Sequence, residues 1–309
     1  MREIKIHSVL WDFGGPIRDS RIALNDAHNA SVEKLLGRKL DEKEKFKADD
    51  TWKVMGLPNF SHESEMIPAL WAIKIKEIKE GVKVPPLTQI LKMEDSAGFI
   101  REIMKRYSLL VKEKNGEYEK TKKLKREIDR WGKVFKAALQ DKEKAPVTNG
   151  TREAMEILTK LGIKQAIVTN AREDSGKEYI QTHVLPAGNW PIVGSETFKE
   201  LKKPHPYPLL AGLHLLHKRT TPPTPRDVKE NGINLFKEIK ELTEGSVYIG
   251  DTPDDVRAAN EAGFISVVMT EGMGNLRLLK AAKPDLIVKN PEELAEILKK
   301  NNGKLRINR

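Results

Sequence analysis

Two largely apolar runs in different parts of the chain each end at an aspartate. The run Ile4–Trp11 leads into Asp12, and the run Val247–Ile249 leads through a glycine into Asp251, with Asp255 four residues further on. A short apolar run that stops at turn residues is typical of a buried strand. Carboxylates at the ends of two strands indicate a site for a metal ion that prefers oxygen ligands.

Two further signals lie between these runs. The apolar run that ends at Val168 is followed by Thr169 and Asn170, and Lys203 stands directly before Pro204, a residue that favours the first turn of a helix. Each of these features alone is common in turns and on surfaces. In the order strand-Asp, strand-Thr, Lys-Pro and strand-Gly-Asp, the four together resemble the motifs of the haloacid dehalogenase (HAD) superfamily of phosphotransferases.

From about Pro146 the sequence alternates between short apolar runs and helical patterns. The predicted strands are 165–169, 191–193, 247–249, 265–269 and 286–288, and the predicted helices are 150–161, 176–182, 207–216, 254–262 and 292–300. Such alternation predicts a parallel sheet covered by helices on both faces, with ligands at the carboxyl ends of the strands. All four motifs fall at that edge of the sheet.

The segment between the first and second motifs has helical periodicity throughout. Its apolar residues recur at helical spacing in 67–78, 99–111 and 124–139, and Gly116 follows the second of these runs as a stop signal. Basic residues occupy the opposite face of the third run, which is the pattern of an amphipathic helix.

These patterns predict an α/β fold with two domains. Residues 1–19 and 146–309 are expected to form a Rossmann-like parallel sheet core, and residues 20–145 an inserted all-helical cap domain. The resemblance implies the same arrangement, because one large HAD subgroup carries its cap between the first and second motifs.

One departure from the family pattern lies between Lys203 and the last strand motif. The proline-rich stretch Thr220–Pro225 is followed by an extra helix predicted at 232–242, so this link is longer than is typical of the family. A surface excursion and an oligomer contact are both compatible with it. The oligomeric state is not predicted.

The composition narrows the possible chemistry. The chain of 309 residues has no cysteine, which excludes disulfides, zinc-thiolate sites and cysteine nucleophiles. It contains no apolar stretch near the roughly 20 residues needed to cross a bilayer, and its amino terminus lacks a signal-peptide pattern. We expect a cytoplasmic protein without a membrane partner.

The formal net charge of +10 leaves three readings open. The excess of basic residues is concentrated in the predicted cap, where it forms either a solvated helix face or a surface that attracts an anionic substrate. Nucleic-acid binding is the third reading, and the segment lacks the interleaved aromatic residues of single-strand binders. No specific nucleic-acid partner is expected.

The resemblance implies a catalytic role for the motif residues. Asp12 is expected to be the nucleophile, which forms an aspartyl phosphate that water then hydrolyses. Lys203 supplies a fixed cation between nucleophile and phosphate, with Lys202 as the alternative for this role. Thr169 and Asn170 are expected to bind phosphoryl oxygens through a hydroxyl and a backbone amide.

The resemblance also implies Mg²⁺ as cofactor. Its expected ligands are Asp12, the backbone carbonyl of Gly14, Asp251 and waters, a hard oxygen set that suits this ion. Asp255 completes the predicted metal site, either by holding a metal-bound water or by orienting Lys203. The alternative is that Asp255 is only an acid at a helix N-terminus, where its charge favours the helix dipole.

Gly14 is the main departure from the family pattern. HAD phosphatases normally carry a second aspartate at this position, which protonates the leaving group and later activates water. General acid–base catalysis contributes roughly 10²–10⁴-fold. Its loss predicts a slow enzyme, an enzyme specialised for good leaving groups such as those of sugar 1-phosphates and acyl phosphates, or an enzyme in which a cap residue serves as the acid. Pro16, where Thr is usual, is a second departure in the same loop.

We therefore expect a magnesium-dependent phosphatase that acts on a small phosphorylated metabolite. Two alternatives remain. Residues 55–62 resemble the cap loop of phosphonoacetaldehyde hydrolase, a C–P hydrolase, but Asn59 stands where that enzyme has its Schiff-base lysine. Gly56 in the same stretch also matches a substrate-specificity loop, and we expect it to contact substrate. The third reading is a degenerate member that binds phosphate or a partner without turnover.

Overall fold

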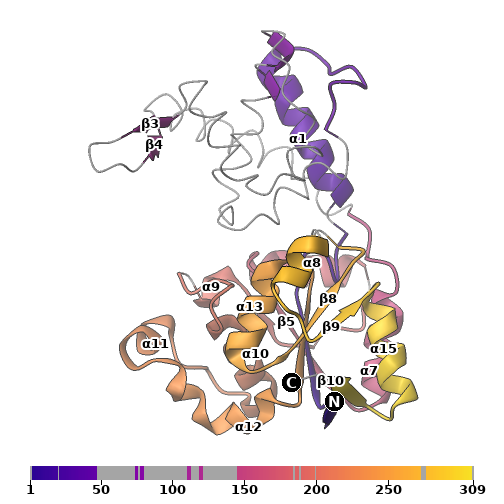
Figure 1. Cartoon of the computed structure of the whole chain (residues 1–309), viewed down its shortest axis with the longest axis vertical. Coiled ribbons are helices and arrows are strands. Elements are labelled where there is room, and N and C mark those ends of the chain that lie inside the picture. Colours follow the sequence, from indigo (N-terminus) through magenta and orange to yellow (C-terminus); the bar gives the residue numbers. More distant parts are fainter. Residues whose placement is uncertain are drawn as a thin grey trace. The chain divides into compact units, whose positions relative to one another are not determined.

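The computed structural model describes residues 2–19, 21–46, 74–75, 77–79, 110–112, 118–120, 145–183, 185–187, 189–198, 200–272 and 276–307. The chain divides into two compact units (Figure 1). One consists of Met1–Asp19 with Pro146–Arg309, and the other of Ser20–Ala145.

A six-stranded parallel sheet lies at the centre of the first unit (Figure 1). The spatial order of its strands is β6-β5-β2-β7-β8-β9. Their bounds are Ser8–Trp11 for β2, Lys164–Val168 for β5, Ile192–Val193 for β6, Ser246–Gly250 for β7, Ile265–Met269 for β8 and Leu286–Val288 for β9. Because β2 lies between β5 and β7, three of the four motifs follow neighbouring strands.

Helices cover both faces of this sheet, as the nearly continuous apolar sequence of its strands requires. On β2, the neighbouring residues Leu10 and Trp11 belong to separate apolar clusters, because successive side chains of a strand point to opposite faces. Trp11 packs in the cluster that includes residues of α7 (Thr151–Lys160), α8 (Glu173–Thr182) and α15 (Pro291–Lys300). Leu10 packs in the cluster that includes residues of α10 (Tyr207–Lys218) and α13 (Pro253–Ala262). The same unit contains the shorter helices α9 (Ser195–Phe198) and α14 (Leu276–Ala281).

The strands and helices predicted after Pro146 are present, with bounds shifted by a few residues, so the predicted α/β fold is confirmed. The predicted first strand is interrupted, however. Its amino-terminal part, β1 (Arg2–Lys5), leaves the sheet and pairs antiparallel with β10 (Lys304–Ile307). The charged side chains of β1 are suited to an exposed ribbon, whereas β2 is fully buried.

The link between Lys203 and β7 also differs from the prediction. Instead of one helix at 232–242, it contains α11 (Pro225–Asn231), the 3₁₀ helix η2 (Ile233–Ile239) and α12 (Lys240–Thr243). A capping box at Thr224, with Pro225 in the first turn, starts α11 inside the proline-rich stretch. Gly232, with φ 73° and ψ −179°, separates α11 from η2.

The second unit contains the described helix α1 (Arg21–Leu36) and helical residues at 74–75 and 77–79, which agrees with the helical prediction for 67–78. The prediction that the segment is helical throughout is wrong at β3 (Leu110–Lys112), which pairs antiparallel with β4 (Tyr118–Lys120). The Asn115-Gly116 dipeptide between these strands is a strong hairpin signal, which outweighs the helical spacing before it. The predicted helix at 124–139 lies outside the described residues. No described helix is long and apolar enough to cross a bilayer.

Candidate active site

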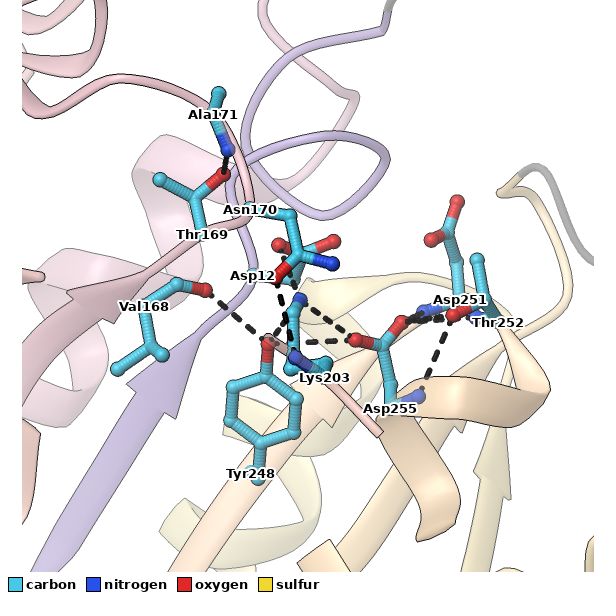
Figure 2. Close-up of polar contacts among 10 residues, drawn as sticks. All are labelled: Asp12, Val168, Thr169, Asn170, Ala171, Lys203, Tyr248, Asp251, Thr252 and Asp255. Carbon is cyan, nitrogen blue, oxygen red and sulfur yellow. Dashed lines mark hydrogen bonds and ion pairs between the residues drawn. The ribbon is translucent and has the colours of Figure 1, made fainter. Parts of the chain in front are cut away.

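The candidate site lies at the carboxyl ends of β2, β5 and β7 (Figure 2). Asp12 directly follows β2, and its backbone N–H donates to the carbonyl of Ile249 at 2.9 Å, which extends the pairing with β7. Thr169 directly follows β5, and its N–H donates to the carbonyl of Val193 at 2.9 Å. Asp251 directly follows β7. The strand pairing itself therefore brings these residues to one edge of the sheet.

A tight turn after Asp12 packs against Asp251. The N–H of Arg18 donates to the carbonyl of Phe13 at 2.9 Å, and the N–H of Gly15 donates to the carbonyl of Arg18 at 3.0 Å. Gly15 has φ 94°, and a Cβ atom at this position would lie 2.0 Å from Oδ2 of Asp251. Both the left-handed backbone and the close approach require glycine here. Thr148 donates its hydroxyl to the Gly15 carbonyl at 2.5 Å and fixes the turn.

Lys203 links two of the carboxylates. Only 6% of the residue is exposed. Its Nζ lies 2.8 Å from Oδ1 of Asp12 and 2.7 Å from Oδ1 of Asp255, and 2.7 Å from the hydroxyl of Tyr248 (Figure 2). Lys202, the alternative considered from the sequence, is exposed. Of the two lysines, Lys203 is therefore the one beside the carboxylates.

Asp255 is held on both of its oxygens. Oδ1 accepts from Lys203, and Oδ2 accepts from the backbone N–H groups of Asp251 (3.1 Å) and Thr252 (3.0 Å) and from the Thr252 hydroxyl (2.7 Å). The Thr252 hydroxyl in turn caps α13 by accepting from the N–H of Asp255. This reciprocal capping box, together with the helix N-terminus, favours the ionised form of the acid.

The buried charges shift one another's pKa values. Burial raises the pKa of Asp12 to about 6, against the opposing effect of the Lys203 ammonium and with a further increase from Asp255. Burial also acts to lower the pKa of Lys203, but the carboxylates of Asp12 and Asp255 raise it above its ordinary value. For Asp255, burial acts upward and Lys203 outweighs it, so its pKa is lowered. Near neutral pH the group holds one ammonium between two carboxylates.

The family assignment follows from comparison with known proteins. The sequence model described as haloacid dehalogenase-like hydrolase matches residues 100–269, which is more than half of the chain. The chain belongs to the haloacid dehalogenase-like hydrolase family. The matched segment includes Thr169, Lys203, Asp251 and Asp255, and it begins after Asp12. The predicted membership of the HAD superfamily is therefore confirmed.

Curated relatives of this HAD hydrolase carry phosphatase names. A candidate pyrophosphatase, PpaX, from Caldanaerobacter subterraneus subsp. tengcongensis is 28% identical over 176 residues, which cover 55% of this chain and 69% of the relative. Phosphoglycolate phosphatases from Neisseria meningitidis and Aquifex aeolicus are 29% and 27% identical, over 50% and 47% of this chain and 57% and 55% of their own lengths. The match therefore spans little more than half of these two relatives.

Solved structures share the fold of this HAD hydrolase. A candidate phosphoglycolate phosphatase from Lactobacillus delbrueckii subsp. bulgaricus superposes with a TM-score of 0.57 at 19% identity, covering 96% of this chain and 99% of that one. A candidate β-phosphoglucomutase from Thermotoga maritima gives a TM-score of 0.53 at 18% identity, with coverage of 96% and 99%. At these identities the likeness supports the fold alone.

The carboxylates of this HAD hydrolase fit a hard divalent cation. Asp12, Asp251 and Asp255 are buried, and each offers an oxygen within 4.8 Å of the others. Oxygen ligands of this kind suit Mg²⁺. The oxygens of Asp255 already accept from Lys203, from Thr252 and from two backbone amides. Asp12 and Asp251 are therefore better placed than Asp255 to be direct ligands.

The remaining predicted site residues have no hydrogen bond to the three carboxylates among the contacts of the described residues. Thr169 is buried, and its Oγ1 accepts from the N–H of Ala171 at 3.1 Å. Asn170 is exposed, and its Oδ1 accepts from the backbone N–H of Lys203 at 3.3 Å. Gly14 lies half-buried in the turn after Asp12. Gly56, the predicted contact of the specificity loop, lies outside the described residues.

Two residues of the site were missed by the sequence interpretation. The sequence predicts Tyr248 only as a residue of a buried strand. Its position two residues before Gly250 is the one sequence signal that its hydroxyl lies near the carboxyl end of that strand. Thr252 had a recognisable signal, because Thr252, Pro253 and Asp255 form the sequence pattern of a capping box with proline in the first turn.

Proposed function

We propose that this chain is a magnesium-dependent phosphatase that acts on a small phosphorylated metabolite through an aspartyl-phosphate intermediate. The observation that carries the proposal is the position of Asp12. It lies at the carboxyl end of a central strand, 2.8 Å from the buried ammonium of Lys203 and next to Asp251. A carboxylate, a fixed cation and a cation site in one place are what phosphoryl transfer requires.

In the proposed reaction, one carboxylate oxygen of Asp12 attacks phosphorus and the bond from phosphorus to the leaving oxygen breaks. Lys203 holds Oδ1, so the other oxygen, Oδ2, is the proposed nucleophile. Water then cleaves the aspartyl phosphate and restores the carboxylate. Mg²⁺ bound by Asp12, Asp251 and the Gly14 carbonyl would supply neutralisation of the repulsion between carboxylate and phosphate. Thr169 and Asn170 are proposed to bind phosphoryl oxygens.

The absence of a side-chain acid at Gly14 favours substrates whose leaving group departs without a proton. The relatives' names offer two contrasting cases. Pyrophosphate releases phosphate, which is a good leaving group, whereas phosphoglycolate releases an alkoxide that must be protonated. We propose that this chain acts on phosphoanhydrides, acyl phosphates or sugar 1-phosphates in preference to alkyl phosphates.

Residues 20–145 are proposed to act as the cap domain, with the stretch around Gly56 contributing to substrate selection. This proposal rests on the resemblance of the Gly56 stretch to specificity loops and on the separate compact unit that the segment forms. A cap of this kind would exclude water during phosphoryl transfer.

A substrate panel tests the proposed function. The purified chain is assayed for phosphate release from pyrophosphate, acetyl phosphate, glucose 1-phosphate, phosphoglycolate and p-nitrophenyl phosphate, with Mg²⁺ or with EDTA. We expect turnover that requires Mg²⁺ and is slowest for phosphoglycolate. If phosphoglycolate is the best substrate, another group supplies the proton. If no substrate is hydrolysed while inorganic phosphate still binds, the degenerate, phosphate-binding reading replaces the enzymatic one.

A further inference from the structure

Tyr248 carries a buried hydroxyl that no step of the proposed reaction uses. The residue is 1% exposed in the middle of β7, within the apolar cluster that includes Leu10 and Tyr207. Its hydroxyl lies 2.7 Å from Nζ of Lys203, 3.2 Å from the carbonyl of Val168 and 3.4 Å from Oδ1 of Asp255 (Figure 2). A tyrosine hydroxyl in the core requires such partners, because burying it without them is unfavourable.

The direction of these hydrogen bonds follows from the donors. A lysine ammonium has three N–H donors and no acceptor, so the Tyr248 hydroxyl accepts from Lys203. Its own proton is then donated to the Val168 carbonyl, which is the nearer of its remaining acceptors. The three donors of Lys203 thus point to Asp12, Asp255 and Tyr248, each at 2.7–2.8 Å.

Two of these three acceptors are immobilised. Asp255 is held by Thr252 and by backbone amides at the start of α13. The ring of Tyr248 is packed in the core, and its hydroxyl is tied to the end of β5, directly before Thr169. The third acceptor, Asp12, is the proposed nucleophile. The fixed pair therefore determines the direction of the third N–H of the ammonium.

We propose that Tyr248 is a positioning residue, which together with Asp255 forms a two-point seat that directs the third N–H of Lys203 at Asp12 and so holds the ammonium charge beside the phosphoryl group bound there. The inference rests on the proposed phosphatase function and adds to it. Phenylalanine would fill the same volume in the core, but it leaves one N–H of Lys203 and the Val168 carbonyl without this partner. The ammonium would then turn away from the direction that the reaction needs.

The test compares two tyrosines. Tyr248→Phe removes the hydroxyl that holds Lys203, and Tyr207→Phe removes a buried hydroxyl of the same core cluster that donates to the Pro223 carbonyl at 2.9 Å. Because both variants lose a buried tyrosine hydroxyl, a merely structural effect appears in both. For the best substrate of the panel we expect Tyr248→Phe to lower kcat about 10- to 100-fold with a smaller change in KM, as loss of a hydrogen bond to a charged group predicts. Tyr207→Phe should keep the wild-type kcat.

A binding measurement makes the test independent of turnover. The affinity for inorganic phosphate is measured by calorimetry in the presence of Mg²⁺ for the wild type, Tyr248→Phe, Lys203→Met and the double variant. We expect Tyr248→Phe to weaken binding about tenfold in the wild-type background and to have no further effect in the Lys203→Met background, because the hydroxyl acts through the ammonium.

The outcomes separate this inference from the proposed function. If the wild type binds phosphate and the variants show the expected losses of affinity, but no substrate is hydrolysed, the phosphatase proposal fails while the positioning role of Tyr248 is supported. If Tyr248→Phe retains wild-type kcat and phosphate affinity, or if Tyr207→Phe loses as much, the seat is contradicted. A loss in Tyr248→Phe that persists unchanged in the Lys203→Met background contradicts it as well.

Discussion

Replacing Gly14 by aspartate should make this chain a better catalyst for alkyl phosphates. The residue lies half-buried in the turn after Asp12. Among the described glycines, Gly15 has a left-handed φ of 94°, whereas Gly14 is not one of those with positive φ. The backbone at position 14 is therefore outside the left-handed region that disfavours a side chain. Gly14→Asp adds a carboxyl group that, when protonated, donates to the leaving oxygen, and the Gly14 carbonyl stays available to Mg²⁺.

The expected size of the effect comes from general acid catalysis. A well-placed acid contributes roughly 10²–10⁴-fold, or about 3–5 kcal/mol in the barrier. If the introduced carboxyl recovers half of the smaller of these barrier reductions, the rate for an alkyl phosphate rises about tenfold. It also adds negative charge near Asp12 and Asp251, which slows every substrate alike. The ratio of kcat/KM for phosphoglycolate to that for p-nitrophenyl phosphate cancels this common effect, and we expect that ratio to rise at least about tenfold.

The assay needs a control of the same shape that lacks the acidic proton. Gly14→Asn provides it, and its ratio should stay at the wild-type value. Both variants are first checked for unchanged Mg²⁺ binding by calorimetry. An equal change for both substrates in Gly14→Asp, or the same rise in Gly14→Asn, would refute the reasoning that the missing acid limits alkyl phosphate hydrolysis.

Three further predictions concern the surroundings of the site. Gly15→Ala should lower the free energy of unfolding by at least about 1–2 kcal/mol and reduce Mg²⁺ affinity. The reason is that the left-handed backbone disfavours a side chain and that the added Cβ would overlap Asp251. An unchanged urea midpoint of unfolding would contradict the packing of this turn against Asp251. Lys203→Met should destabilise the Mg²⁺-free protein by about 3 kcal/mol, since two buried carboxylates lose their cation, and added Mg²⁺ should restore part of this in thermal unfolding. Burial and the neighbouring Lys164 lower the pKa of His217 to about 4, so the neutral imidazole is favoured in the folded state. The stability that neutral His217 contributes is present above pH 6.5 and is lost as the pH falls toward 4. After discounting for its partial exposure, we expect the wild type to lose about 1 kcal/mol more than His217→Gln between pH 7.5 and pH 5 in urea unfolding.

Much of the site was predictable because its position follows from sheet topology. Apolar runs that end in Asp12, Thr169 and Asp251 predict parallel strands, and the carboxyl ends of parallel strands meet at one edge. The strand order places β2 between β5 and β7, so the three residues follow adjacent strands. That inference requires no knowledge of which side chains contact one another.

Other features depend on tertiary contacts that local patterns do not encode. Lys202 and Lys203 are equivalent in sequence, and only the turn before α10 decides which of them is buried. Tyr248 looks like an ordinary strand residue until Lys203 and Val168 supply partners for its hydroxyl. The pairing of β1 with β10 joins the two ends of the first unit, and a period-2 pattern in β1 does not name its partner.

The most direct test of the account is to identify the phosphorylated residue. The chain is mixed with acetyl phosphate and Mg²⁺, quenched in acid within the first turnover, digested and analysed by mass spectrometry. The account predicts a phosphate adduct, cleaved by hydroxylamine, on the peptide that contains Asp12, and neither adduct nor turnover in Asp12→Asn. Wild-type turnover in Asp12→Asn, or an adduct on a different residue, would contradict it.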